Sequence, residues 1–255
     1  MSRTNLPRAL IEVAYAEAAR QYLRRLLPEH FMEATAQAKQ REITLESLAL
    51  VTPRRPEVQV FNELLVQYPR RGHKRPWQVV PDNMIVLHDE PIKADGSYDV
   101  PIQPVGPFWV LEYVSKHNKR KDYDDNFDKY EKELKVPYYL IFYPDNQDLT
   151  LYFLKRRRYV SVKPNEHDRY PIPELELEMA LLDGWVRYWF RGELLPLPDQ
   201  LLRDLEAARR QAEEQRQRAE EQRQRAENAE QRAENAEQRV EALQRELERM
   251  RRGLK

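Results

Sequence analysis

The chain has 255 residues, and its 43 Lys and Arg residues balance its 43 Asp and Glu residues. A formal net charge of zero excludes a protein that coats nucleic acid by bulk positive charge, so any basic surface must be local. Cysteine is absent, which excludes disulfides, thiolate metal sites and a cysteine nucleophile. The sequence has no run of roughly 18 apolar residues and no signal-peptide core, so we expect a cytoplasmic protein without membrane contact.

The first part of the chain is predicted to be helical. Residues 10–27 combine helical apolar spacing with many alanines, and Pro28 follows them. A second helical stretch is predicted over residues 31–39. A third is predicted over residues 58–68, where apolar side chains lie between two prolines.

Strands dominate the middle of the chain. Residues 107–115 are rich in aromatic and branched side chains, and residues 138–143 form an apolar run typical of a buried central strand. A polar helix is predicted between them, over residues 121–135, so the unit predicts a parallel strand pair joined by a right-handed crossover. The other predicted strands are residues 77–80, 84–87, 149–154, 159–162, 185–190 and 193–195.

These elements predict an α/β fold, a mixed sheet flanked by helices, over residues 1–198. Pro196 and Pro198 interrupt regular structure at its end. Residues 199–255 follow as a separate segment that contains no proline.

This C-terminal segment has a seven-residue repeat that predicts a long coiled-coil helix. The a positions of the repeat are Leu205, Ala212, Ala219, Ala226, Ala233, Val240 and Leu247. The d positions are Ala208, Gln215, Gln222, Ala229, Ala236, Leu243 and Met250. We expect a homo-oligomer that associates chiefly through the last two heptads, since alanine buries little apolar area. The alternative is a single solvated helix supported by Glu–Arg pairs four residues apart.

Two acidic residues lie where the apolar pattern does not favour a charge. Glu112 is inside the predicted strand 107–115, and Asp82 follows Pro81 between two apolar segments. A buried carboxylate is costly unless a cation or hydrogen-bond donors meet it. On neighbouring strands the two acids would form a hard oxygen site suited to Mg²⁺ or Mn²⁺. The alternatives are a solvent-facing or ion-paired Glu112 on an edge strand and a plain turn at Asp82.

A basic segment follows the strand that carries Glu112. Its cations are Lys116, Lys119, Arg120 and Lys121. Clustered Lys and Arg side chains bind phosphates well, so this segment is a candidate DNA-binding surface. The alternative is a solvated loop leading into the next helix.

Several of these motifs together resemble the Uma-two family of restriction-endonuclease-like proteins, within the PD-(D/E)xK nuclease superfamily. The resemblance covers roughly residues 45–195. It rests on Pro81-Asp82, Trp109–Ser115, Asp122, Lys129-Tyr130 and Val136–Ile141. It implies an α/β nuclease core in which an Asp and a Glu hold a divalent metal and a Lys assists the attacking water. Many members of the family also end in a coiled coil.

The resemblance assigns roles to particular residues. Asp82 matches the first acid, Glu112 matches the second, and Ser115 matches a serine three residues after that glutamate. Glu63, on the predicted helix 58–68, is a candidate additional metal-side acid, and a surface glutamate is its alternative reading.

The lysine departs from the family pattern. Val114 stands at the usual superfamily position, and Asn126 stands where the family often places the lysine on the following helix. Lys129, about one helical turn after Asn126, is one replacement, and Lys116 is the other.

We therefore predict an Mg²⁺- or Mn²⁺-dependent DNA endonuclease that hydrolyses phosphodiester bonds and self-associates through its C-terminal helix. The sequence does not distinguish DNA from RNA as the substrate. The alternative is a catalytically degenerate nuclease-fold scaffold or binding protein that acts through its coiled coil.

Overall fold

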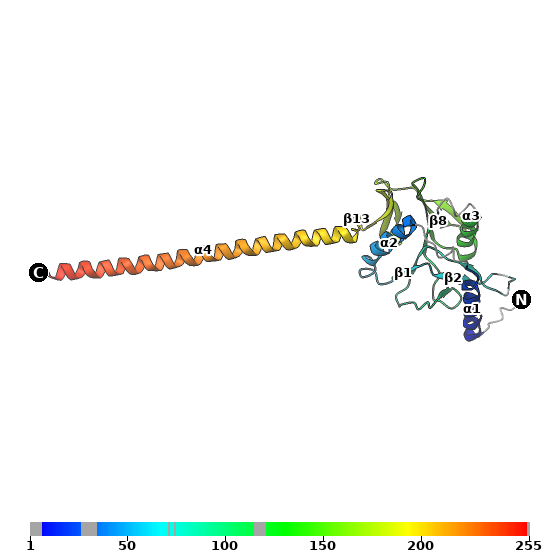
Figure 1. Cartoon of the computed structure of the whole chain (residues 1–255), viewed down its shortest axis with the longest axis horizontal. Coiled ribbons are helices and arrows are strands. Elements are labelled where there is room, and N and C mark those ends of the chain that lie inside the picture. Colours follow the sequence, from blue (N-terminus) through cyan, green and yellow to red (C-terminus); the bar gives the residue numbers. More distant parts are fainter. Residues whose placement is uncertain (1–6, 27–34, 71, 74, 115–120, 254–255) are drawn as a thin grey trace. The chain divides into compact units, whose positions relative to one another are not determined.

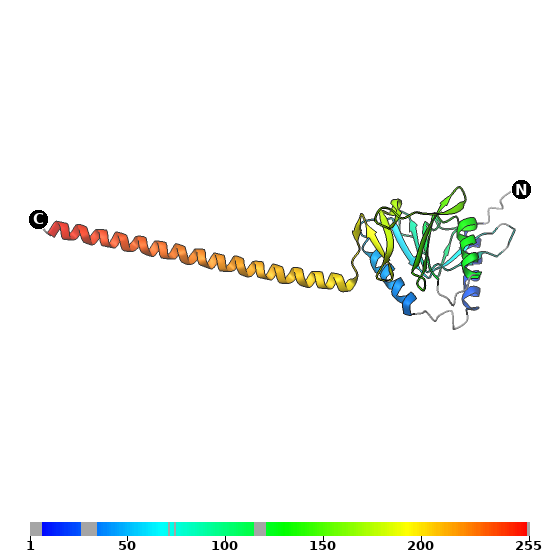
Figure 2. The ribbon, with the colours of Figure 1, turned by 90° about the horizontal axis from the view of Figure 1, so that it is seen from above.

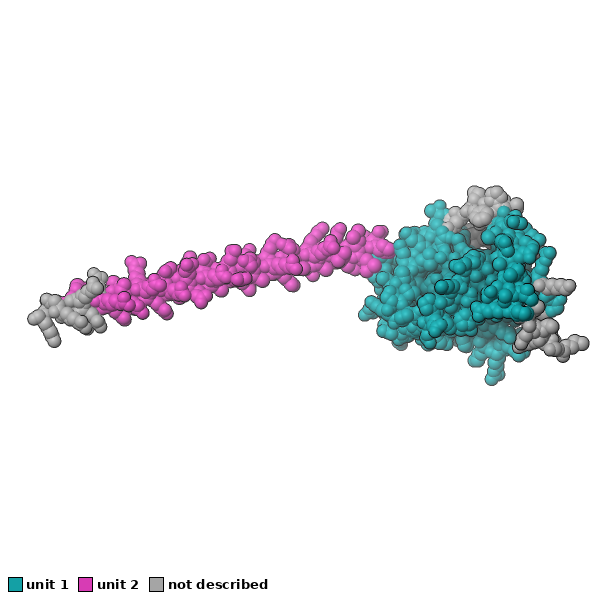
Figure 3. All heavy atoms as spheres, turned by 90° about the horizontal axis from the view of Figure 1, so that it is seen from below, with its two compact units in different colours: residues 1–197 teal, residues 198–255 magenta. Residues whose placement is uncertain are grey.

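A computed structural model of the chain describes residues 7–26, 35–70, 72–73, 75–114 and 121–253 (Figure 1). The chain divides into two compact units, residues 1–197 and 198–255, which are coloured separately in Figure 3. In its described residues the first unit contains mixed and antiparallel sheets with flanking helices. A long helix forms the second unit. The predicted α/β fold with a long C-terminal helix is confirmed.

A mixed six-stranded sheet with strand order β1-β4-β6-β7-β8-β9 organises the first unit. Its strands are β1 (Val58–Asn62), β4 (Asn83–Leu87), β6 (Trp109–Tyr113), β7 (Tyr138–Tyr143), β8 (Asp148–Lys155) and β9 (Arg158–Ser161). Strands β6 and β7 run parallel, and the other neighbouring pairs run antiparallel. The chain between β6 and β7 contains α3 (Lys121–Asp128) and the π-helical turn η2 (Lys129–Leu134), so the predicted strand–helix–strand unit is confirmed.

The two faces of this sheet pack against different elements, because alternate residues of a strand point to opposite faces. Trp109 and Leu111 of β6 belong to a core cluster that also includes Leu48 near the end of α2 (Thr35–Ala49). Val110, between them, belongs to a second cluster with Tyr130 of η2. Accordingly, α2 and α3 lie on opposite sides of the strands in both ribbon views (Figures 1 and 2).

Two smaller sheets complete the first unit. An antiparallel sheet consists of β10 (Tyr170–Ile172), β11 (Leu177–Leu182), β12 (Trp185–Phe190) and β13 (Glu193–Leu194), with the short 3-10 helix η3 (Pro173–Leu175) after β10. A three-stranded sheet consists of β3 (Trp77–Val79), β2 (Leu65–Tyr68) and β5 (Ser97–Asp99). The first helix, α1 (Arg8–Leu23), contacts β2 and β5.

The helix predicted over residues 58–68 is wrong. These residues form β1 and β2, which are separated by a tight turn in which Glu63 has φ 47°. The apolar spacing fits a helix as well as a strand, and the long-range pairing of β1 with β4 decides in favour of strands.

The second predicted helix, residues 31–39, ends too early in the prediction. The described helix α2 begins at Thr35 and continues ten residues past the predicted end, to Ala49, while residues 31–34 lie outside the described part of the structure. The prediction also missed the short strands β5 and β10 and the six-residue strand β11.

The second unit is the helix α4 (Pro198–Gly253). Each of its residues whose burial the structure describes is exposed. Among the described residues of the whole chain, no helix has both the length and the apolar character needed to cross a membrane.

Candidate active site

Glu112 lies in a strand whose five residues are all buried. Its side chain is 8% exposed, and β6 is a central strand between β4 and β7. The solvent-facing edge position is therefore excluded for this carboxylate. Burial makes its ionised form costly, so its neighbours decide what it can do.

Asp82 lies near Glu112, immediately before the adjacent strand β4. The antiparallel register of β4 and β6 ends with the pair Asn83 and Leu111, which are the chain neighbours of Asp82 and Glu112. Asp82 itself precedes β4, and its negative charge and its backbone N–H both act on the Glu112 carboxylate. The fold thus brings together two acids that are thirty positions apart in the sequence.

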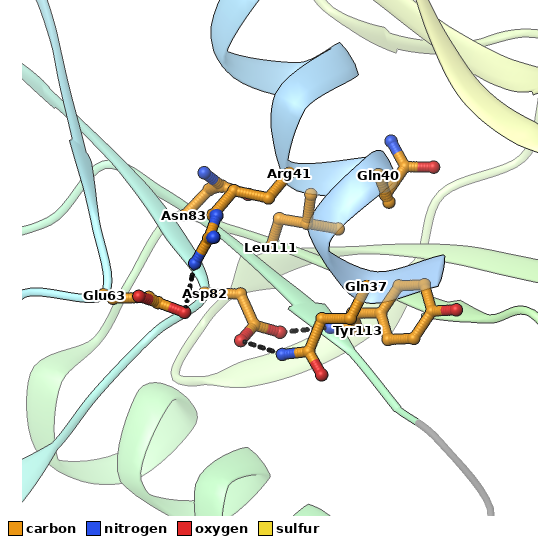
Figure 4. A pocket seen from close by; sticks show the side chains of 8 residues that line it. All are labelled: Gln37, Gln40, Arg41, Glu63, Asp82, Asn83, Leu111 and Tyr113. Atoms are coloured by element: carbon orange, nitrogen blue, oxygen red, sulfur yellow. Dashed lines mark hydrogen bonds and ion pairs between the residues drawn. The ribbon is translucent and has the colours of Figure 1, made fainter. Parts of the chain in front are cut away.

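Asp82 is held by donors from two elements (Figure 4). One carboxylate oxygen, Oδ2, accepts a hydrogen bond of 2.6 Å from the backbone N–H of Tyr113. The other, Oδ1, accepts one of 3.1 Å from the side-chain amide of Gln37 on α2. These bonds fix the carboxylate at the end of β6.

Glu112 receives donors from the helical segment that follows β6. The hydroxyl of Tyr130 donates to Oε1 at 2.5 Å, and the amide of Asn126 donates to the same oxygen at 3.4 Å. Tyr130 is fully buried and lies in η2, immediately after the α-helical turn that carries Asn126. The α3–η2 segment therefore supplies the polar partners of a carboxylate that the sheet buries.

The pKa of Glu112 is raised well above its ordinary value. Burial is the largest cause, and the negative charge of Asp82 raises the pKa further. The hydrogen bond from Tyr130, the positive charge of Lys129 and a hydrogen bond from the backbone N–H of Asp82 oppose this rise. The two acids therefore interact as like charges in a desolvated place, which is an arrangement found at catalytic and metal-binding sites.

Lys129 is a cation near Glu112. Its ammonium donates to Oδ1 of Asn126 at 3.3 Å, and its charge acts on Glu112. Asn126, at the position where the resemblance implies a lysine, thus bridges Lys129 to Glu112. This candidate lysine therefore lies near Glu112.

Glu63 is near Asp82 but has a different partner. Its carboxylate forms an ion pair of 2.5 Å with Arg41 of α2, and its backbone N–H donates to the carbonyl of Asp82 at 3.2 Å. Both residues of the ion pair line a small pocket beside Asp82 (Figure 4). The other residues of its lining are Gln37, Gln40, Asn83, Leu111 and Tyr113.

The donor chemistry of Asp82 and Glu112 fits a hard divalent cation. Among the described residues, no group of three or more His, Asp or Glu side chains could hold a metal, so Glu63 does not join the pair in a three-acid ligand set. A two-carboxylate site is compatible with Mg²⁺, which keeps several waters and takes other ligands from substrate phosphates. A cation would also relieve the repulsion that raises the pKa of Glu112.

The remaining predicted site residues fall largely outside the described structure. Lys116, Lys119 and Arg120 lie in the undescribed segment 115–120, as does Ser115. Lys121 is the first residue of α3, and its side chain is not described.

Sequence reasoning missed three residues that hold the two acids. It assigned no role to Gln37, Tyr130 or the amide of Asn126. Tyr130 carries a weak sequence signal, because a tyrosine beside Lys129 on the helix after β6 can reach back to that strand. Gln37 carries none, because its contact with Asp82 spans 45 positions and depends on how α2 packs.

Comparison with known protein families identifies the family of this chain. Residues 30–183 match the model of the Uma2 family, which is described as "Putative restriction endonuclease". This match covers more than half of the sequence, and the chain therefore belongs to the Uma2 family.

One solved structure similar to this chain is described as a "putative nuclease belonging to DUF820" from Anabaena variabilis ATCC 29413. The two are 16% identical, with a TM-score of 0.43, over 56% of this chain and 75% of that one. No curated protein matches the sequence significantly.

Proposed function

We propose that this protein is a nuclease that uses Mg²⁺ or Mn²⁺, held by Asp82 and Glu112, to hydrolyse phosphodiester bonds in DNA. The observation that supports the proposal is that the charges of Asp82 and Lys129 both act on the buried carboxylate of Glu112. Membership of the Uma2 family supports the nuclease class.

Different residues of the chain would have different roles in this reaction. A bound cation supplies positive charge to the phosphate and acidifies a water molecule. Lys129 would stabilise negative charge that develops on the phosphate, since a fixed ammonium acts strongly where water is excluded. Tyr130 and Asn126 hold Glu112, while Gln37 and the N–H of Tyr113 hold Asp82, so both carboxylates are oriented before the substrate binds. Lys116 remains the second candidate lysine.

We propose that the basic residues after β6 contact the DNA backbone. Lys116, Lys119, Arg120 and Lys121 follow in sequence directly after the strand that carries Glu112. Phosphate contacts from such a cluster would position the substrate without reading its bases. We also propose that the protein is a homo-oligomer formed through α4, because the helix exposes its apolar seam.

A second candidate function is a nuclease fold that has lost catalysis and acts as a scaffold through α4. The observation that favours it is that Tyr130 and Asn126 both donate to Glu112. A buried carboxylate satisfied in this way can persist without a cation.

Plasmid cleavage tests the catalytic proposal. The purified full-length protein is incubated with supercoiled plasmid, with EDTA, Mg²⁺ or Mn²⁺. We expect nicking that requires the metal and is lost in Glu112→Gln and Asp82→Asn. The matched control is Glu166→Gln, which removes an exposed carboxylate before β10 and should cleave as the native protein does.

Metal binding is measured separately, as the shift in melting temperature with Mn²⁺ and by calorimetric titration. A cation that binds only the folded state raises the melting temperature, and Glu112→Gln should abolish that rise. Binding without cleavage would favour the scaffold. Absence of binding by the native protein, or cleavage that survives Glu112→Gln, would contradict the proposed site.

A further inference from the structure

The helix α4 exposes an apolar seam near its C-terminal end. Val240, Leu243, Leu247 and Met250 are 53%, 56%, 50% and 60% exposed, and they occupy successive a and d positions of the heptad repeat. Contiguous exposed apolar side chains mark surfaces that bind another molecule. A partner helix matches this seam when its own apolar residues recur every seven residues.

We infer that the occupant is α4 of a second copy, aligned parallel and in register as a two-stranded coiled coil. This inference rests on the self-association proposed above and adds the orientation, register and number of strands. Val240 at a with Leu243 at d is the combination that favours two strands in parallel coiled coils.

The composition of the seam favours the parallel in-register alignment. In that alignment each a or d residue meets its own equivalent, so the apolar C-terminal layers stack on one another. Gln215 likewise meets Gln215 and Gln222 meets Gln222, and paired amides can hydrogen-bond to each other. In an antiparallel pair overlapping along the whole seam, Val240 would instead meet Gln215 of the second copy, which places a buried amide against an apolar side chain.

The charges flanking the seam favour the same alignment. In a parallel pair, a g residue meets the e residue five positions later in the second copy. The attractive pairs would be Asp204–Arg209, Arg225–Glu230 and Arg232–Glu237, against one repulsive pair, Arg218–Arg223. In the overlapped antiparallel pair, g faces g and e faces e. Its repulsive pairs, Arg218–Arg239 and Arg225–Arg232, would balance its attractive pairs, Arg216–Glu237 and Arg223–Glu230.

This alignment has a consequence for the folded units. Because Pro198 begins α4 in each chain, both copies of residues 1–197 would be tethered to the same end of the coiled coil. Two nuclease units joined at one end suit a two-fold substrate such as duplex DNA.

Disulfide trapping tests the inference directly, because the natural chain contains no cysteine. Ala219→Cys and Ala236→Cys each place one thiol in the seam, and alanine to cysteine is a small change. Each full-length variant is oxidised alone. The two are also coexpressed, with an affinity tag on one chain, and oxidised together.

We expect each variant alone to form a covalent dimer, and the coexpressed pair to give no link between positions 219 and 236. In the parallel pair these positions are about 25 Å apart along the axis, from 1.5 Å per residue. Light scattering should give twice the 30.7 kDa chain mass.

A dominant 219–236 link would overturn the parallel orientation, and a mass of three chains would overturn the two-stranded state. A monomeric mass would overturn self-association itself. Plasmid cleavage is not a readout here, so failure of the nuclease proposal and failure of this inference are recognised separately.

Discussion

Replacing Glu112 by glutamine removes a buried negative charge while keeping the length of the side chain and an oxygen that can accept hydrogen bonds from Tyr130 and Asn126. The pKa of Glu112 is raised in the folded protein by burial and by Asp82. Between its unfolded pKa, near 4.5, and its raised folded pKa, the folded state keeps a proton that the unfolded state has lost. In metal-free buffer, the free energy of unfolding therefore falls as pH rises through this window.

The size of the effect follows from linkage of one proton. One bound proton gives a slope of at most about 1.4 kcal/mol per pH unit. Carboxylates with lowered pKa values, such as Glu57 beside Arg55, make the free energy of unfolding rise with pH instead of fall. Their contribution is complete above the unfolded pKa and no longer changes with pH there. Above about pH 5.5, roughly one unit past that value, the difference between native protein and Glu112→Gln isolates the contribution of Glu112.

Urea unfolding in EDTA at pH values from about 5.5 to 8.5 measures this difference. Tryptophan fluorescence reports the first unit alone, because the four tryptophans, including Trp109 on β6, all precede α4. We expect Glu112→Gln to gain stability relative to the native protein as pH rises toward the raised folded pKa of Glu112. If the difference in free energy of unfolding between the two proteins does not change with pH, the reasoning that burial raises the pKa of Glu112 is refuted.

Three further sets of substitutions test the contact between Tyr130 and Glu112, the packing of α2 against β12, and association through α4. Tyr130→Phe removes the donor to Oε1 of Glu112 and should lower the free energy of unfolding by about 1–3 kcal/mol in urea titrations, and an unchanged stability would contradict that contact. Gln40→Ala removes two buried hydrogen bonds between α2 and Val186 of β12, at 3.1 and 2.8 Å, and should cost about 2–4 kcal/mol. Glu42→Ala, on the exposed side of α2, is its control and should change stability by less than about 0.5 kcal/mol. Leu243→Asp with Leu247→Asp should make the full-length protein monomeric by light scattering without changing the tryptophan-monitored unfolding, and a retained oligomer would place the contact elsewhere.

Local pattern was sufficient for the strongly apolar or strongly periodic parts of this chain. The strand Tyr138–Tyr143 was predicted residue for residue, because an uninterrupted aromatic and branched run has few alternatives. Glu112 and Asp82 were identified as anomalies, since each is a charge next to apolar segments. Residues 58–68 were misassigned because their apolar spacing suits both helix and strand, and only pairing with β4 resolves the choice.

The sequence by itself therefore determined the class of fold, the heptad repeat of α4 and the identity of the two acids, because these depend on neighbours within a few positions. Tertiary structure alone decided that the charge of Asp82 acts on Glu112, that Tyr130 and Gln37 hold the two acids, and that Glu63 pairs with Arg41. Those facts depend on strand register and on how helices pack across the sheet. Both are set by the sum of many contacts between distant residues, which no local pattern records.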